Sequence, residues 1–84
     1  MTWTIRFTRQ AEKDLRRLTP KLRDKVKQIL RNRVAVDPYC GKALVGDLRG
    51  YYSLRISYKD RLLYTIRDEQ LLVIVIRART HYGE

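Results

Sequence analysis

The first residues of the chain alternate between apolar and polar side chains. Trp3, Ile5 and Phe7 fall on one face of an extended backbone, and the polar residues between them fall on the other. A period of two is typical of a half-buried β-strand. We therefore predict a strand over residues 2–7.

A helical pattern follows this strand. Thr8 can cap a helix N-terminus, and Ala11, Leu15 and Leu18 then recur at helical spacing. Charged residues fill most of the positions between them. We predict a first helix that begins after Thr8 and ends near Leu18.

A second, longer helix is predicted directly after the first. Thr19 provides an N-cap and Pro20 stands at the first helical position, where its missing N–H costs nothing. Its apolar stripe consists of Leu22, Val26, Ile29, Leu30 and Val34. The helix should end before Asp37, because the residue before a proline resists the α conformation. Two amphipathic helices with so short a connection form a helical hairpin.

The rest of the chain is predicted to be a loop followed by three strands. Residues 37–50 contain Pro and Gly and form the loop, in which a short strand at 43–45 is an open alternative. The strands are predicted at 51–57, 61–67 and 71–78, with turns at 58–60 and 68–70. Such short connections favour an antiparallel meander.

These elements predict one α+β domain over residues 1–84 with the order β-α-α-β-β-β. The helical hairpin should pack on a small, mainly antiparallel, four-stranded sheet.

The charge of the chain is strongly positive. Nineteen Lys and Arg oppose nine Asp and Glu, which gives +10, and thirteen of the nineteen are Arg. Residues 1–36 carry eleven basic and three acidic side chains, so the hairpin supplies most of the excess. This balance favours a polyanionic partner, RNA above all, or an acidic protein. A solvated basic helix face without a specific partner is the alternative.

Several classes of protein are excluded by composition. A single cysteine, Cys40, and a single histidine, His81, predict neither a disulfide nor a metal site. There is no signal-peptide pattern, and the longest apolar run, 71–76, is too short to span a bilayer. No Gly-rich phosphate loop, paired carboxylates or Ser-His-Asp set is present. We expect a cytoplasmic protein without cofactor, metal or membrane contact.

The candidate chemistry lies late in the chain. Arg55 and Arg61 flank the turn at 58–60, and antiparallel pairing would bring them together. If the last strand pairs with the strand that begins at Arg61, its C-terminal end returns to the same corner. That end carries Arg77, Arg79, His81 and Tyr82.

This combination of side chains suits RNA cleavage by attack of a 2′-hydroxyl on the adjacent phosphate. Histidine can act as acid or base, and arginine can stabilise the charged phosphorane. Tyrosine can stack on a base or orient a phosphate. Against this stands the ordinary interpretation, in which His81 and the arginines are solvated. Tyr52 and Tyr64 are expected to pack in or on the sheet.

Three short motifs give the chain a resemblance to a known family. They are GYYSLRI at 50–56, DRLLY at 60–64 and a basic tail that ends in HY at 81–82. In this order they resemble the RelE/ParE toxin superfamily, and most closely its YoeB/Txe branch. The segment from Ile5 to Leu15 also resembles the start of these toxins. The resemblance covers essentially the whole chain, and β-α-α-β-β-β is the fold order of the superfamily.

The resemblance implies a metal-independent endoribonuclease toxin that cuts mRNA in the ribosomal A site. Arg55 and Arg61 match the phosphate-stabilising arginines, His81 matches the proton donor, and Tyr82 matches the terminal tyrosine beside it. Lys42 occupies the position where the YoeB branch has a glutamate general base. The base is therefore unassigned: His81 could serve, or Lys42 and Arg61 could favour the 2′-alkoxide.

The remaining expected RNA contacts are Arg79, Arg77, Lys59 and Lys42. The segment 78–80 lengthens the tail relative to the YoeB branch, so Arg79 could share the role of His81. The resemblance also implies contacts with ribosomal RNA and a cognate antitoxin, and it leaves a homodimer open.

Two other functions fit the same fold. One is a ParE-like toxin that inhibits DNA gyrase without cutting RNA. The other is an inactive relative that only binds its antitoxin. The His81-Tyr82 tail favours the nuclease, whereas Lys42 in place of glutamate keeps the inactive form open.

Overall fold

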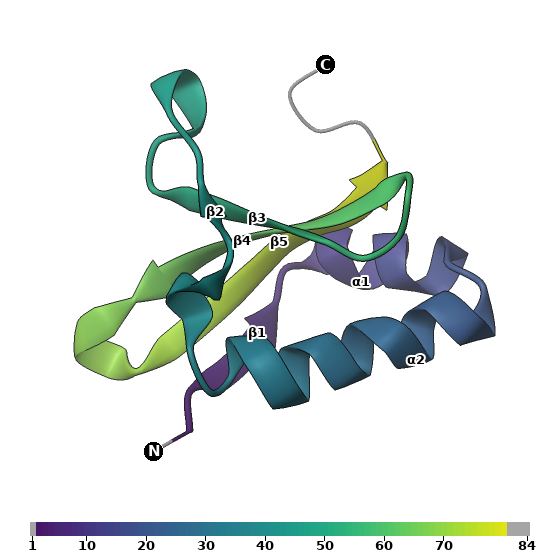
Figure 1. Cartoon of the computed structure of the whole chain (residues 1–84), viewed down its shortest axis with the longest axis horizontal. Helices are drawn as coiled ribbons and strands as arrows, with labels where there is room; N and C mark the ends of the chain where they lie inside the picture. The colour runs from purple at the N-terminus through teal and green to yellow at the C-terminus, as the bar shows by residue number, and fades with distance from the viewer. Residues whose placement is uncertain (1, 81–84) are drawn as a thin grey trace.

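The computed structural model describes the backbone of residues 2–80 and the side chains of residues 2–78. Two helices and five strands follow one another along the chain (Figure 1). They are β1 (Thr4–Phe7), α1 (Arg9–Arg17), α2 (Pro20–Ile29), β2 (Lys42–Ala43), β3 (Tyr51–Arg55), β4 (Asp60–Arg67) and β5 (Leu72–Thr80). No helix in this part of the chain is long and apolar enough to cross a membrane.

The strands form one mixed sheet in the order β1-β5-β4-β3-β2. β1 pairs parallel to β5, and the other neighbours are antiparallel. The α+β class, the element order and the meander are confirmed, but the predicted number of four strands is wrong. The fifth strand is β2, which lies at Lys42–Ala43 rather than at 43–45 and pairs with Ser53 and Tyr52. A strand of two residues is too short to show an alternation of apolar and polar side chains in the sequence. Its position depends on its pairing with β3.

Both predicted helix starts are confirmed. The Thr8 hydroxyl accepts a hydrogen bond from the Ala11 N–H at 3.1 Å, and the Thr19 hydroxyl accepts one from the Leu22 N–H at 3.2 Å. After Ile29 the backbone widens into a π-helical turn over Leu30–Val34. Helical structure thus continues almost to the predicted end before Asp37.

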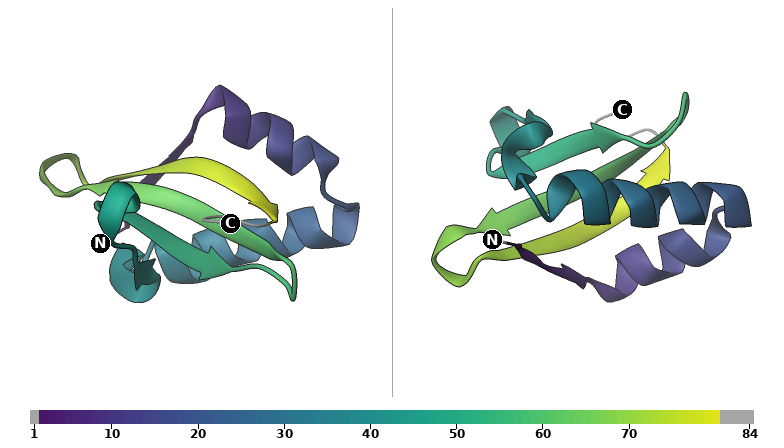
Figure 2. Two further views of the ribbon diagram at one scale, coloured as in Figure 1. Left: turned by 90° about the horizontal axis from the view of Figure 1, so that it is seen from above. Right: turned by 60° about the horizontal axis from the view of Figure 1, so that its bottom comes forward.

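The core lies between the helices and the sheet. α2 crosses one face of the sheet, and α1 lies beside β5 (Figure 2). The buried cluster combines apolar residues of both layers: Ala11, Val26, Ile29, Leu30, Val34, Leu54, Ile56, Leu62, Tyr64, Val73, Val75 and Ala78. The helical stripe and the alternating strand positions predicted from sequence therefore meet in one core.

Aromatic residues fix the loop before β2 to the sheet. Tyr64 is fully buried and donates a hydrogen bond to the Pro38 carbonyl at 2.7 Å, and burial raises its pKa above the ordinary value. Tyr52 stacks on Tyr64 with ring centroids 5.8 Å apart. Tyr39 contacts Tyr52 edge-on, and its hydrogen bond to Asp68 raises its pKa to about 12. The expected packing role of Tyr52 and Tyr64 is confirmed.

Candidate functional site

Three arginines form a row across one end of the sheet. Arg55 on β3 is the register partner of Arg61 on β4, and Arg61 is the register partner of Arg79 on β5. The neighbouring row, Leu54, Leu62 and Ala78, is buried in the core. Successive side chains of a strand point to opposite faces, so Arg55 and Arg61 lie on the sheet face away from the core. The predicted convergence of these strand ends is confirmed for the backbone. We call Arg55, Arg61 and Arg79 the arginine row.

The members of the row differ in exposure. The Arg55 side chain is exposed, whereas Arg61 in the central strand is half-buried. A guanidinium that has lost part of its water interacts more strongly with a bound anion. Arg61 is therefore the better placed of the two to stabilise charge that develops on a phosphate.

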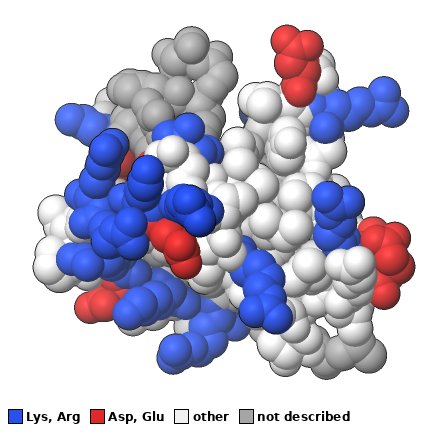
Figure 3. Space-filling view, turned by 180° about the vertical axis from the view of Figure 1, so that it is seen from behind, with Lys and Arg blue, Asp and Glu red and all other residues white. Residues whose placement is uncertain are grey.

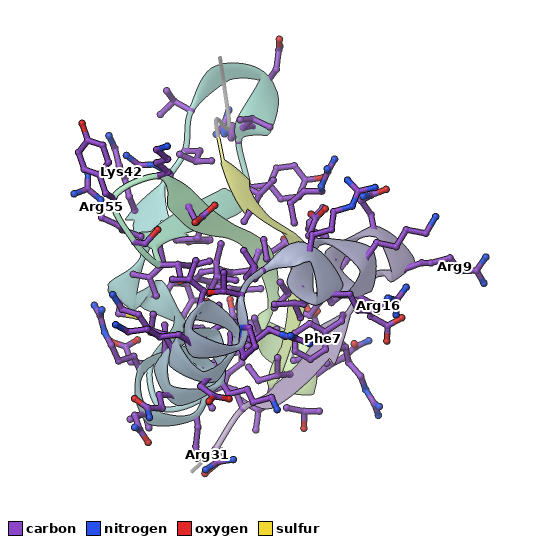
Figure 4. The ribbon with its side chains drawn as sticks, turned by 90° about the vertical axis from the view of Figure 1, so that its right-hand side faces the viewer. Phe7, Arg9, Arg16, Arg31, Lys42 and Arg55 are labelled. Carbon is purple, nitrogen blue, oxygen red and sulfur yellow. The ribbon has the colours of Figure 1, made fainter. Side chains whose placement is uncertain are left out.

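Lys42 lies at the edge of the same face. Its register partner on β3 is Ser53, two residues before Arg55 and hence on the same side of the strand. Figure 4 shows Lys42 and Arg55 on the same side of the molecule. Lys42 thus extends the positive charge of the row toward β2, and its expected contact with RNA stays a prediction.

Lys59 stands at the tip of the β3–β4 hairpin and is exposed. The hairpin is closed by hydrogen bonds to the Asp60 carbonyl from the N–H groups of Ile56, at 2.8 Å, and Ser57, at 3.2 Å. The Ser57 hydroxyl also donates to the Asp60 carboxylate at 3.0 Å and accepts from the Asp60 N–H at 3.2 Å. This network holds Lys59 next to the arginine row.

Arg77 is bound to a carboxylate. Its Nε lies 2.8 Å from Oδ2 of Asp14, a residue of α1 that is only 4% exposed. The same oxygen accepts the Ala78 N–H at 3.1 Å, and Oδ1 accepts from the Gln10 amide at 3.2 Å. Arg77 therefore joins α1 to β5, and its expected contact with RNA stays a prediction.

The charge of Asp14 is set by two opposing effects. Burial works to raise the pKa of its carboxyl, but the hydrogen bonds from Arg77, Ala78 and Gln10 outweigh burial and hold the pKa below its usual value. Asp14 thus stays ionised. It anchors the strand directly before Arg79, the last member of the arginine row.

Sequence reasoning does not single out Asp14, although one signal is present. Ala11, Asp14, Leu15 and Leu18 occupy one helical face, so Asp14 is an acid at a core-facing position. A buried carboxylate needs hydrogen-bond partners, and β5 supplies them.

His81 and Tyr82 lie outside the described residues. The described part of β5 ends at Thr80, which pairs with Asp60 next to Arg61. The convergence of His81 and Tyr82 with the arginine row stays a prediction.

A second feature is a groove between the two helices. Its volume is about 410 Å³, and its lining consists of Phe7, Glu12, Leu15, Arg16, Arg23, Val26, Lys27 and Leu30. Its apolar lining residues are Phe7, Leu15, Val26 and Leu30, which we call the floor of the groove, and Phe7 lies between the helices in Figure 4. Nε of Arg23 is buried without a hydrogen-bond partner among the described residues. Hence the groove combines an apolar floor with three cations and one carboxylate, Glu12, which leaves its lining with net positive charge.

The chemistry open to the described residues is that of fixed cations. Arginine keeps its charge at any working pH and can bind a phosphate through two donors. Residues 2–80 contain no cluster of three or more His, Cys, Asp or Glu side chains that could hold a metal ion. The arginine row is therefore suited to bind a phosphodiester and to stabilise negative charge on it.

Comparison with known proteins identifies the family. A family model described as a ParE-like toxin of type II bacterial toxin–antitoxin systems matches residues 5–83. Toxin RelG of Mycobacterium tuberculosis is 36% identical over 79 residues, which cover 93% of this chain and 90% of that toxin. Toxin YoeB of Streptomyces coelicolor is 43% identical over 53 residues, which cover 58% of this chain and 61% of that toxin.

Solved structures show the same relationship. A chain of the M. tuberculosis toxin–antitoxin complex RelBE2 aligns with a TM-score of 0.87 and 33% identity, covering 96% of this chain and 93% of that one. The YoeB dimer of Staphylococcus aureus aligns with a TM-score of 0.78 and 27% identity, covering 95% and 98%. The resemblance inferred from the motifs is thereby confirmed. The chain belongs to the ParE-like toxins of type II bacterial toxin–antitoxin systems, within the RelE/ParE superfamily.

Proposed function

We propose that this toxin is a ribosome-dependent endoribonuclease that cuts mRNA in the ribosomal A site. The observation that carries the proposal is the arginine row, in which three strands present one arginine each at the same end of the sheet. A scissile phosphate bound over Arg61 would have an arginine on each of the two neighbouring strands.

The proposed reaction is an internal transfer at phosphorus. The 2′-oxygen attacks the adjacent phosphorus, and the bond from phosphorus to the 5′-oxygen breaks. The products are a 2′,3′-cyclic phosphate and a 5′-hydroxyl. Arg55 and Arg61 stabilise the charge on the phosphorane, and His81 supplies the proton to the leaving 5′-oxygen. Tyr82 orients the substrate beside His81.

The proton of the 2′-hydroxyl has two routes in this proposal. Either His81 accepts it before donating it to the leaving oxygen, or water accepts it while Lys42 and Arg61 stabilise the 2′-alkoxide. The two routes differ in their dependence on Lys42, and Lys42→Ala distinguishes them. Loss of cleavage supports the alkoxide route, and unchanged cleavage supports His81.

The helical hairpin is proposed to dock on ribosomal RNA. Its exposed cations gather on one side of the molecule (Figure 3). They include Arg9, Lys13, Arg16, Arg17, Lys21, Lys25, Lys27, Arg31 and Arg33. Contacts of this kind position a protein on nucleic acid and weaken as salt rises.

The groove between the helices is proposed to receive the antitoxin. Solved structures of relatives include the RelBE2 complex of M. tuberculosis and a YoeB–YefM complex of S. aureus. An antitoxin segment with apolar and acidic side chains would cover the floor and neutralise Arg16 and Lys27. It would also supply an acceptor for the buried Nε of Arg23.

A second candidate function is inhibition of DNA gyrase. It is favoured by the ParE-like family model and by Lys42, which puts a cation where the YoeB branch has its general base.

A homodimer is also consistent with the YoeB dimer of S. aureus, and sedimentation velocity of the purified chain tests it.

The test is performed in a translating extract with a defined message, alongside a gyrase supercoiling assay. The proposal predicts codon-phased cuts only in translated message, which His81→Ala and Arg61→Ala abolish. Arg67→Ala is the matched control, since Arg67 lies on the same face of β4 at its other end. An intact message together with arrested supercoiling would establish the gyrase inhibitor instead. Inactivity in both assays, with the antitoxin still bound, would establish the inactive relative.

A further inference from the structure

Tyr58 at the tip of the β3–β4 hairpin is 89% exposed. It is more exposed than any other large hydrophobic side chain that the structure describes as exposed. Phe7 lines the groove, and Tyr39 is bound to Asp68 and packs on Trp3 and Tyr52. In contrast, Tyr58 makes no hydrogen bond or ring contact with another residue of the described range. Its ring is thus presented to solvent.

The backbone that carries Tyr58 is held in place. Hydrogen bonds join Ile56 and Ser57, which precede Tyr58 in the chain, to Asp60, which follows it, and so close the turn. A ring on a braced turn loses less conformational entropy on binding than a ring on a loose loop. Tyr58 is thus preorganised for a flat ligand.

Most charged neighbours of Tyr58 along the chain are cations, and the one carboxylate among them, Asp60, accepts a hydrogen bond from the Ser57 hydroxyl. Tyr58 lies three positions from Arg55 in one direction and three positions from Arg61 in the other, so at a strand rise of about 3.3 Å per residue the Cα atoms of both lie within roughly 10 Å. Lys59 is exposed directly beside it. An aromatic ring beside cations in this way is the arrangement with which proteins hold single-stranded nucleic acid, where cations bind phosphates and rings stack on bases.

We propose that Tyr58 is a stacking platform for an unpaired base of the RNA strand whose phosphates bind Arg55 and Arg61. This inference rests on the proposed function and adds a base contact next to the phosphate contacts. The ring binds any base through its π-face, so it contributes affinity at one nucleotide without reading a hydrogen-bond pattern. A stacked base would also hold the strand unstacked beside the scissile phosphate.

The experiment measures binding of short single-stranded 2′-O-methyl RNA by fluorescence anisotropy, because this RNA cannot undergo 2′-oxygen attack. The full chain is compared with Tyr58→Ala, Tyr58→Phe and Tyr58→Leu, and Val36→Ala is the control at an exposed site outside the arginine row. One abasic position is moved along the RNA, and each titration is repeated over a range of salt.

Tyr58→Ala should weaken binding by roughly 5- to 150-fold, Tyr58→Phe should bind like the unchanged chain, and Tyr58→Leu should resemble Tyr58→Ala. The salt dependence should stay the same, whereas Arg55→Ala should reduce its slope by about one. At one particular position along the RNA, removal of the base should weaken binding to the unchanged chain but not binding to Tyr58→Ala.

Two results would overturn the inference. Equal affinities of the unchanged chain and Tyr58→Ala would show that no base stacks there. An equal penalty for the abasic position in both proteins would place the stacked base elsewhere. The inference also fails if the unchanged chain does not bind this free RNA at low salt, whereas the proposed function is tested separately by the cleavage of translated message.

Discussion

The end of β5 depends on one carboxylate. Asp14 binds both the side chain of Arg77 and the backbone of Ala78, so a single residue of α1 fixes the strand just before the arginine row. Because the folded state lowers the pKa of Asp14, its contribution to stability is fully present above the unfolded value of about 4. That contribution is lost as the pH falls through the folded pKa.

Asp14→Asn should therefore destabilise the chain by about 1.5–3 kcal/mol at pH 7, the range for hydrogen bonds to a charged group. The difference from the unchanged chain should shrink as the pH falls toward 3. Urea unfolding at several pH values measures it, with Asp24→Asn on the exposed side of α2 as the control. A difference that does not change with pH would mean that the charge of Asp14 has no part in stability.

Gly41 is constrained by its contact with Tyr64. A Cβ atom at Gly41 would overlap the Tyr64 hydroxyl and lie 3.1 Å from the Ser53 carbonyl oxygen. Gly41→Ala should cost about 1–3 kcal/mol through overpacking. Tyr64→Phe alone should cost about 1 kcal/mol, because it removes the hydrogen bond to the Pro38 carbonyl.

The two substitutions together should cost less than the sum of the single ones, because Phe removes the atom that the new methyl group meets. Chemical denaturation of the unchanged chain, the two single variants and the double variant measures this difference in the free energy of unfolding. Additive losses would contradict the close contact between Gly41 and Tyr64.

Two helix caps of the same type lie in different surroundings. Thr8 caps α1 and also donates to the Ile76 carbonyl at 2.9 Å, whereas exposed Thr19 only caps α2. Thr19→Ala should cost about 1 kcal/mol, as typical caps do. Thr8→Ala should cost about 1 kcal/mol more, because it also removes a bond that holds α1 to β5. Equal losses in urea unfolding would mean that the second bond of Thr8 contributes nothing.

At the scale of elements, local signals determine what the sequence predicts. Caps at Thr8 and Thr19, the apolar stripes and the short turns are local, and they predict both helices and the β3–β5 meander. β2 and the parallel pairing of β1 with β5 depend on distant partners. The pairing of Arg55 with Arg61 follows from the short β3–β4 hairpin, which is why it could be predicted. The pairing of Arg61 with Arg79 depends on a register shift in the β4–β5 pair between Leu63 and Tyr64, so the sequence predicts only that these strand ends meet. The Asp14–Arg77 pair joins residues 63 positions apart, and no local pattern marks it.

At the scale of the whole molecule, charge divides the protein into regions. The hairpin carries most of the excess positive charge, and the arginine row lies at the end of the sheet. The first region is proposed to position the toxin on the ribosome and the second to act on the phosphodiester. Substitutions in the two regions should therefore have different effects.

Replacing both Arg31 and Arg33 with Ala should reduce the salt slope of ribosome binding by about two if each contacts one phosphate. The rate of cleavage at saturating toxin should stay unchanged, because neither residue belongs to the arginine row. Binding and single-turnover assays measured over a range of salt test this. A slower rate at saturation would contradict the separation of docking from chemistry.

The most direct test of the central claim is the single-turnover rate of mRNA cleavage on purified ribosome complexes at saturating toxin, compared for Arg61→Ala and Arg67→Ala. Both substitutions remove one arginine from the same face of β4, and only Arg61 belongs to the arginine row. If the row stabilises the phosphorane, Arg61→Ala should slow cleavage by about 10²–10³-fold, the usual loss for one electrostatic contact to the transition state. Arg67→Ala should cleave at the rate of the unchanged chain. Equal rates for the two variants would contradict the assignment of the arginine row as the catalytic site.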